Sequence, residues 1–167
     1  MNTLFNIRPA NINDAASIAS IGYSCFQDTY KGLVSEEFLQ SIDLEKQIER
    51  AETTIKQGGS ILMATDDKHY AVGYCAFGST RETLHPRENE IYSLFISKRA
   101  RGSGLGTILL YEAERIFPVA KPVMVRILRG NTLARNFFEG NGFKYLPDRD
   151  GTFRNVAPDV AYIKYIC

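Results

Sequence analysis

The sequence has few of the residues that build cross-linked or metal-bound frameworks. It contains three cysteines, two histidines and no tryptophan in 167 residues. Cys25, Cys75 and Cys167 have neither the even number nor the CxxC spacing that a disulfide framework or a zinc site needs. We therefore expect reduced thiols, a cytoplasmic location and no metal.

An excess of charge of one sign and a long apolar run are also missing. Twenty Lys and Arg against 19 Asp and Glu leave a net charge of +1, which gives no overall attraction to nucleic acid or an anionic membrane. No run of about 18 apolar residues occurs, and the opening MNTLFNIRPANIND has no basic region followed by an apolar stretch. We expect no nucleic-acid partner, no membrane partner and no targeting segment.

The composition is typical of one folded domain. Hydrophobic residues make up 44% and charged residues 23% of the chain, and no linker, repeat or low-complexity tract divides it. We therefore expect residues 1–167 to form a single domain.

Hydrophobic periodicity predicts a mixed α/β order. A strand is expected at Leu4–Arg8 and should stop at Pro9, because proline cannot donate to a strand ladder. A helix should run from Ile12 to about Phe26, with Asn13 or Asp14 as its cap. Later helices are expected from Ser35, at Leu44–Lys56, Leu105–Phe117 and Thr132–Glu139. Later strands are expected at Ser60–Thr65, Tyr70–Gly78, Glu90–Ser97, Val123–Leu128, Phe143–Leu146 and Val160–Ile166.

The densest chemical signal is the segment 90–106, EIYSLFISKRARGSGLG. An apolar strand passes through a basic turn and three glycines directly into a helix. Glycines let backbone N–H groups approach a ligand, and a helix start offers unpaired donors and a positive dipole end, so the segment suits a phosphate or pyrophosphate. The spacing GxGxG with no following lysine matches neither a P-loop nor a dinucleotide fingerprint.

At this segment the sequence resembles the GNAT superfamily of acyl-CoA-dependent N-acyltransferases. Arg101, Gly104 and Gly106 match the family's Gln/Arg-x-x-Gly-x-Gly/Ala motif. Residues 131–143, NTLARNFFEGNGF, resemble its N-x-x-A-x-x-F-Y-x-x-x-G-F segment, and the opening from 7 to 39 resembles the N-terminal strand and helices of small bacterial members. The resemblance therefore covers nearly the whole chain.

The resemblance implies a fold and an activity. The fold would be an α/β (α+β) GNAT domain with a mixed, mostly antiparallel sheet of six to seven strands and about four helices. The reaction would be transfer of an acetyl group from acetyl-CoA to a primary amine, by direct attack in a ternary complex. The partners would be acetyl-CoA and the amine acceptor, and the protein would be a monomer or a homodimer.

The resemblance also implies the residues that hold acetyl-CoA. Main-chain groups of the strand before the loop would contact the pantetheine arm, and backbone amides of the loop would wrap the pyrophosphate. The strand residues are Leu94, Phe95 and Ile96, and the loop residues are Arg101, Gly102, Ser103, Gly104, Leu105, Gly106 and Thr107. Asn131 and Phe138 would lie beside the thioester end.

Charge is unevenly distributed along the chain. Residues 98–135 carry eight positive and two negative side chains, a net of +6. This stretch includes Lys98, Arg99 and Arg101, and it suits a polyanionic ligand. Residues 11–45 carry six negative and one positive side chain, a net of −5. In the family this region walls the acceptor pocket, so an acidic wall would attract a cationic amine.

The chemistry calls for a group that deprotonates the amine. An alkylamine with a pKa near 10.4 is only about one part in a thousand neutral at pH 7. Glu90 stands where several members of the family carry a catalytic glutamate, and strand parity puts it on one face with Tyr92 and Leu94. We therefore expect Glu90 to act as a general base, directly or through a water. Backbone N–H groups near Phe95–Ile96 would polarise the thioester carbonyl.

The usual general acid of the family is missing. Phe138 stands where many members have a tyrosine. A thiol with a pKa near 8.5 can leave as thiolate at pH 7 at a cost of about 2 kcal/mol, so the general acid could be dispensable or be replaced by water. Alternatively, Tyr92 or Tyr145 could act as the general acid. Tyr30 resembles an aromatic residue that lines the acceptor site in relatives.

Two other functions fit parts of the sequence. The phenylalanine at 138 leaves open a catalytically weak acyl-CoA sensor or interaction module. A third possible function is an NTP-binding switch, but the P-loop lysine that it would need is missing. The acceptor itself is not specified: a polyamine, an amino acid, an antibiotic, a peptide N-terminus and a protein lysine all fit.

Overall fold

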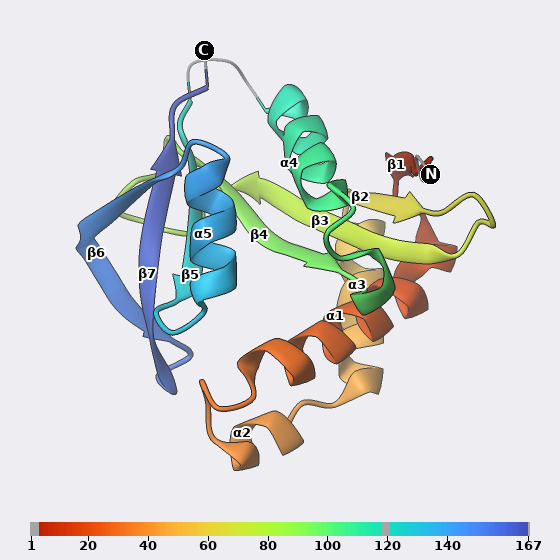
Figure 1. Ribbon diagram of the computed structural model, residues 1–167, viewed down its shortest axis with the longest axis horizontal. Coiled ribbons are helices and arrows are strands. Elements are labelled where there is room, and N and C mark those ends of the chain that lie inside the picture. Colours follow the sequence, from red (N-terminus) through yellow and green to blue (C-terminus); the bar gives the residue numbers. More distant parts are fainter. Residues whose placement is uncertain (1–3, 118–120, 167) are drawn as a thin grey trace.

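The computed structural model describes residues 4–117 and 121–166, which form seven strands and five α-helices (Figure 1). The N-terminal part contains β1 (Asn6–Pro9), the 3-10 turn η1 (Ile12–Asp14), α1 (Ala15–Tyr30), α2 (Glu36–Gln40) and α3 (Leu44–Lys56). The middle contains β2 (Ser60–Thr65), β3 (Ala71–Ser79), β4 (Asn89–Ile96), the turn η2 (Lys98–Ala100) and α4 (Leu105–Ile116). The C-terminal part contains β5 (Val123–Leu128), α5 (Thr132–Gly140), β6 (Lys144–Phe153) and β7 (Ala157–Lys164).

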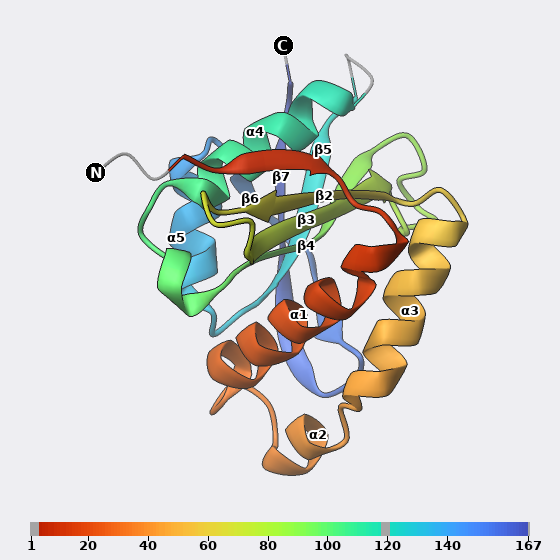
Figure 2. The ribbon, with the colours of Figure 1, turned by 90° about the vertical axis from the view of Figure 1, so that its right-hand side faces the viewer.

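All seven strands form one sheet in the order β1-β2-β3-β4-β5-β7-β6. Neighbouring strands are antiparallel except β4 and β5, which are parallel. Figure 2 shows α4 above the sheet and α1 and α3 below it. Each face has its own core: Leu105 and Leu109 belong to the cluster under α4, whereas Ile18 and Met63 belong to the cluster under α1 and α3.

The predicted bounds of α3, β2 and β5 are confirmed, and the first helical stretch begins at Ile12 as predicted, as η1, but both ends of β1 and the end of α1 at Tyr30 differ from the predictions. Pro9 is the last residue of β1 and pairs with Leu62 instead of ending the strand earlier. Because β1 is an edge strand, the missing N–H of Pro9 removes no ladder bond from a second neighbour. Asp14 is the N-cap residue of α1, as one of the two predictions had it, but its side chain makes no cap bond there. The side-chain cap belongs to η1: Asn11 accepts from Asn13 N–H while Asp14 accepts from Asn11 N–H.

The C-terminal hairpin is longer than predicted. β6 extends to Phe153, well beyond the expected end at Leu146, and β7 begins at Ala157. The register shifts between Leu146 and Gly151, so an irregularity interrupts the alternation that sequence reasoning depends on.

The central pair of strands, β4 and β5, separates after a short contact. Only three residue pairs join them, from Asn89 opposite Val123 to Ile91 opposite Val125. Figure 1 shows the two strands diverging beyond this point. The rest of β4 therefore has a ladder partner on the β3 side only, and its other edge is open.

A β-bulge lies where the separation begins. Ile91 pairs with Phe77 and Ser93 pairs with Ala76, which leaves Tyr92 as the extra residue. The bulge reverses the alternation of β4: Leu94 packs with Ile91 in the cluster under α4. The predicted face shared by Glu90 and Leu94 is therefore wrong, because parity counting assumes an unbroken strand.

Candidate functional site

The glycine loop before α4 presents a set of unpaired backbone donors. Gly102 (φ 77°) and Gly104 (φ 85°) are left-handed, and Gly104 is the N-cap of α4 without a side-chain cap. Within the described ranges, no acceptor is bound by the N–H groups of Gly102, Ser103, Gly104, Gly106 and Thr107. These donors and the positive end of the α4 dipole suit a phosphate group.

Gly106 brings the two sequence motifs together. A Cβ at this position would lie 3.1 Å from the ring of Phe137, so a side chain here would press on that ring, and glycine lets α5 approach the first turn of α4 without a shift. Asn131 caps α5 by accepting from Ala134 N–H at 3.1 Å. Phe138 is 6% exposed and packs between Phe137 and Phe143 in the core, so this position offers no hydroxyl.

The arginines beside the loop are tied to neighbouring segments. Arg101 Nε donates to the Ile96 carbonyl at 3.2 Å, and its Nη2 lies 3.9 Å from the Asp28 carboxylate on α1. Arg99 pairs with Asp66 at 3.0 Å in the turn between β2 and β3. The backbone donors of the loop are therefore freer to meet a phosphate than these two side chains.

The main-chain N–H and C=O groups that point to the open edge of β4 belong to alternate residues of the strand. Ser97 N–H donates to the Val72 carbonyl at 2.8 Å, so Ser97 and Val72 form a hydrogen-bonded pair of the antiparallel β3–β4 ladder. Hydrogen-bonded and non-hydrogen-bonded pairs alternate along such a ladder. By alternation, the main-chain groups of Phe95 face β3, whereas those of Leu94 and Ile96 face the open edge. The main-chain contact predicted from Phe95 does not fit this register, whereas the contacts predicted from Leu94 and Ile96 are compatible with it and stay predictions.

A cleft of about 620 Å³ lies on the opposite face of the sheet from α4, beside the divergence of β4 and β5. Its walls come from α1, α3, the start of the β3–β4 connection, β4, β5 and the β6–β7 hairpin. The lining includes Tyr23, Phe26, Tyr30, Gln47, Arg50, Arg81, Tyr92, Ser93, Phe95, Arg126, Ile127, Phe153, Arg154 and Asp159. The cleft and the glycine loop thus lie on either side of the open edge of β4.

Tyr30 lines this cleft, at the position that the family resemblance suggested. Its ring packs against Phe26 with centroids 4.0 Å apart and against Phe153 at 5.9 Å. Burial raises the pKa of its hydroxyl. The contact of Tyr30 with an acceptor stays a prediction.

Glu90 is 2% exposed and lies behind the cleft wall. Its Oε2 accepts from the backbone N–H of Arg81 at 2.8 Å, and its Oε1 accepts from Arg81 Nε at 3.1 Å. Arg81 and Tyr92 separate it from the cleft, with the guanidinium 4.6 Å from the tyrosine ring centroid. A proton could reach Glu90 only by way of these groups or an ordered water.

The two tyrosines proposed as acids lie in different places. Tyr92 lines the cleft and donates to the Ser79 carbonyl; burial and the nearby charge of Glu90 raise its pKa. Tyr145 lies on the edge strand β6, where its hydroxyl donates to Asp150. Tyr145 is not among the residues that line the cleft.

The predicted acidic wall does not face the cleft. None of the carboxylates between residues 11 and 45 is among its lining residues. Asp14 pairs with Arg8, which lowers its pKa, while Asp43 caps α3 by accepting from Lys46 N–H. Net charge along a segment does not reveal which side chains point outward, so the prediction was wrong. Sequence reasoning also missed Arg50 and Arg154, because each is a lone arginine in its own element.

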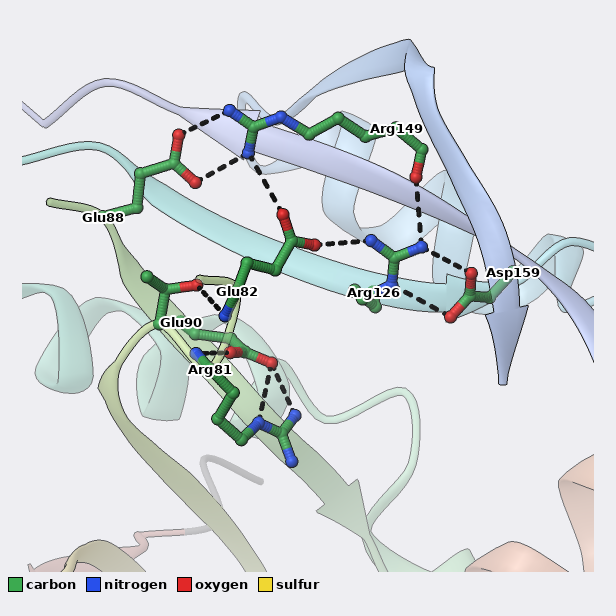
Figure 3. A network of polar contacts seen from close by, with 8 residues as sticks. Arg81, Glu82, Glu88, Glu90, Arg126, Arg149 and Asp159 are labelled. Carbon is green, nitrogen blue, oxygen red and sulfur yellow. Dashed lines mark hydrogen bonds and ion pairs between the residues drawn. The ribbon is translucent and has the colours of Figure 1, made fainter. Parts of the chain in front are cut away.

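A network of ion pairs joins the β3–β4 connection to the C-terminal hairpin (Figure 3). Arg126 binds Asp159 through Nε at 3.0 Å and Nη2 at 2.6 Å and also pairs with Glu82. Arg149 binds both oxygens of Glu88 at 2.7 Å. The network holds β5, β6 and β7 against the segment that carries Arg81.

Asp159→Asn should lower the free energy of unfolding by about 2 kcal/mol, because it removes the buried carboxylate that holds two nitrogens of the half-buried Arg126 guanidinium. Asp159 is 4% exposed. Urea unfolding measures the change, and Asp150→Asn is the matched control because its pair with Arg129 is exposed and should contribute about 1 kcal/mol or less. Equal losses in the two variants would show that the network does not stabilise this region.

Two kinds of site are absent from the part of the chain that the structure describes. No group of three or more His, Cys, Asp and Glu side chains there could hold a metal ion. No helix among those residues is long and apolar enough to cross a membrane.

Solved structures share this fold along the whole chain. The PaiA N-acetyltransferase of Thermoplasma acidophilum, in complex with coenzyme A, is 23% identical, with a TM-score of 0.81, over 98% of this chain and 99% of that one. The ribosomal-protein-alanine N-acetyltransferase of Brucella melitensis is 23% identical, with a TM-score of 0.70, over 96% and 99%. YncA of Salmonella typhimurium, with its cofactor acetyl-CoA, is 19% identical, with a TM-score of 0.69, over 96% and 92%.

Sequence comparison gives the family. A search of curated proteins finds no match. The family model for acetyltransferases of the GNAT family matches residues 23–143. This match spans both motifs, the open edge of β4 and the glycine loop, and the predicted GNAT fold is confirmed by the solved structures. The chain therefore belongs to the GNAT acetyltransferase family.

Proposed function

We propose that the protein transfers an acetyl group from acetyl-CoA to a primary amine. The observation that carries the proposal is the open edge of β4, which leads from the unpaired donors of the glycine loop to the cleft. An extended pantetheine arm can hydrogen-bond such an edge as a strand would. Two similar structures contain coenzyme A or acetyl-CoA, which supports this choice of donor.

The chain's own groups suit direct attack. The amine nitrogen would enter from the cleft, bond to the thioester carbonyl carbon and lose a proton. The N–H groups of Leu94 and Ile96 would hold the oxygen that becomes negative. As the C–S bond breaks, the sulfur keeps the electron pair and leaves as a thiolate, which solvent can protonate.

Glu90 is our candidate for the proton acceptor. Because Arg81 holds both of its oxygens, the proton would travel through a water beside Tyr92. Tyr92, which lines the cleft, is better placed than Tyr145 to donate to the thiolate. We place the reaction in the cytoplasm, a proposal supported by Cys25 and Cys75, which are buried free thiols; Cys167 lies outside the described residues.

A thiol-release assay with acetyl-CoA and a panel of amines tests the proposal. We expect release of free thiol that depends on both substrates, and N-acetyl product at one equivalent per thiol by mass spectrometry. Thermal stabilisation by acetyl-CoA without any thiol release would overturn the enzyme proposal. It would favour the acyl-CoA sensor that Phe138 leaves open, because this core phenylalanine has no hydroxyl to donate.

A further inference from the structure

The charged groups of the cleft are almost all basic. Four arginines and one aspartate line it. Two of the arginines are neutralised within the protein: Arg126 by Asp159 and Glu82, and Arg81 by Glu90. The remaining two carry charge that a ligand can meet.

These two residues are Arg50 on α3 and Arg154 in the turn between β6 and β7. Within residues 4–117 and 121–166, neither guanidinium forms an ion pair. They share one electrostatic environment: partial burial lowers the pKa of Arg154, and the positive charges of Arg50 and Arg81 lower it further. A cationic group entering here would be repelled, and an anion would relieve the repulsion.

The backbone holds Arg154 in an uncommon conformation at this place. Arg154 and Asn155 have φ values of 46° and 59°, and Val156 N–H donates to the Phe153 carbonyl at 2.9 Å, which closes a tight hairpin turn. Asparagine tolerates a left-handed conformation, but arginine seldom adopts it. The guanidinium lies 5.2 Å from the Phe153 ring centroid, at the cleft.

Beside the arginines, the cleft has an aromatic wall. Phe26, Tyr30 and Phe153 line it and contact one another, with centroids 4.0 Å to 6.1 Å apart. Phe38 packs against Phe26 and Phe153 at 6.2 Å. This wall offers apolar area to the body of a ligand whose anionic end reaches the arginines.

We infer that the acceptor of the proposed reaction is a small primary amine that also carries an apolar body and an oxyanion, a carboxylate or a phosphonate. The inference rests on the proposed function, since it assigns the amine that would be acetylated. Arg50 and Arg154 bind the oxyanion, the aromatic wall binds the body, and the amine points to the open edge of β4. A cleft of about 620 Å³ has room for a molecule of this size.

Matched acceptors test the inference in the thiol-release assay. The panel is L-phenylalanine, its phosphonate analogue, L-phenylalaninamide and spermidine. The amide has more neutral amine at pH 7, because it lacks the negative charge that raises the amine pKa. Reactivity alone would therefore favour the amide. We expect kcat/KM for the two anionic acceptors to exceed that for the amide and spermidine at least tenfold; equal or better turnover of the amide or spermidine would overturn the inference.

Variants connect the preference to the arginines. Arg50→Gln and Arg154→Asn should each lower kcat/KM for L-phenylalanine about tenfold and leave the amide unchanged, and Arg154→Lys should recover part of the loss. Asparagine suits the left-handed backbone at 154. Arg115→Gln on the exposed face of α4 is the control and should change neither acceptor. A loss shared by acid and amide would contradict the proposed anion contact.

Calorimetry separates this inference from the proposed function. L-phenylalanine and its amide are titrated into the protein loaded with coenzyme A, a measurement that needs no turnover. If no amine releases thiol, the enzyme proposal fails. Even then, the anion subsite is supported if L-phenylalanine binds at least tenfold more tightly than its amide and Arg154→Asn abolishes this difference. Equal affinities, or a difference that survives in Arg154→Asn, overturn it.

Discussion

Glu90→Gln is expected to lower kcat/KM for the amine about 100-fold at pH 7, within the range that general bases contribute. The deficit should shrink as the pH approaches 10, because an alkylamine with a pKa near 10.4 then loses its proton to solvent. Glutamine keeps one oxygen for Arg81 but sets an NH2 group against the other Arg81 donor and removes the charge, so some loss of stability is expected beside the loss of proton uptake. Initial rates from pH 6 to pH 10, at saturating acetyl-CoA, measure it.

Glu88→Gln is the matched control for this experiment. Glu88 is also a buried glutamate paired with an arginine, and it lies outside the residues that line the cleft. It should destabilise the protein without changing the shape of the pH profile. A deficit in Glu90→Gln that is the same at every pH would show that Glu90 positions Arg81 and Tyr92 and does not accept a proton.

Gly104→Val is expected to raise KM for acetyl-CoA ten- to hundredfold with a smaller effect on KM for the amine. A β-branched residue avoids the φ of 85° found at Gly104, so the loop must shift and its N–H groups no longer converge on one anion. Loss of one charge-assisted hydrogen bond costs about 1.5–3 kcal/mol, which corresponds to a ten- to hundredfold rise in KM. Steady-state kinetics measure the two KM values, and calorimetry with coenzyme A measures its affinity.

Gly58→Val separates backbone strain from ligand binding. Gly58 has a similar φ of 77°, and, as at Gly104, nothing lies within 4 Å of a Cβ there. Both variants should lose about 1–2 kcal/mol of folding free energy, but only Gly104→Val should lose affinity for coenzyme A. A comparable loss of affinity in Gly58→Val would mean that the effect is global.

The glycine loop and its unpaired donors could be predicted from the sequence because they are local features. Glycines at 102, 104 and 106 between an apolar strand and an amphipathic helix give the donors their positions within a few residues of one another. The bounds of α3 and β5 were predicted for the same reason, since uninterrupted periodicity is a property of neighbours in sequence. The bulge at Tyr92 interrupts that periodicity and was not predictable from alternation.

The sequence by itself determined the family, the glycine-rich turn between β4 and α4 and the absence of a family tyrosine at Phe138. The tertiary structure alone decided the charge of the cleft. Sequence reasoning put an acidic wall there, but Arg50 from α3 and Arg154 from the β6–β7 turn meet in the cleft while the acidic side chains of the N-terminal helices face elsewhere. The physical reason is that the field in a cleft depends on which distant segments fold beside one another, and the net charge of a stretch of chain does not record this.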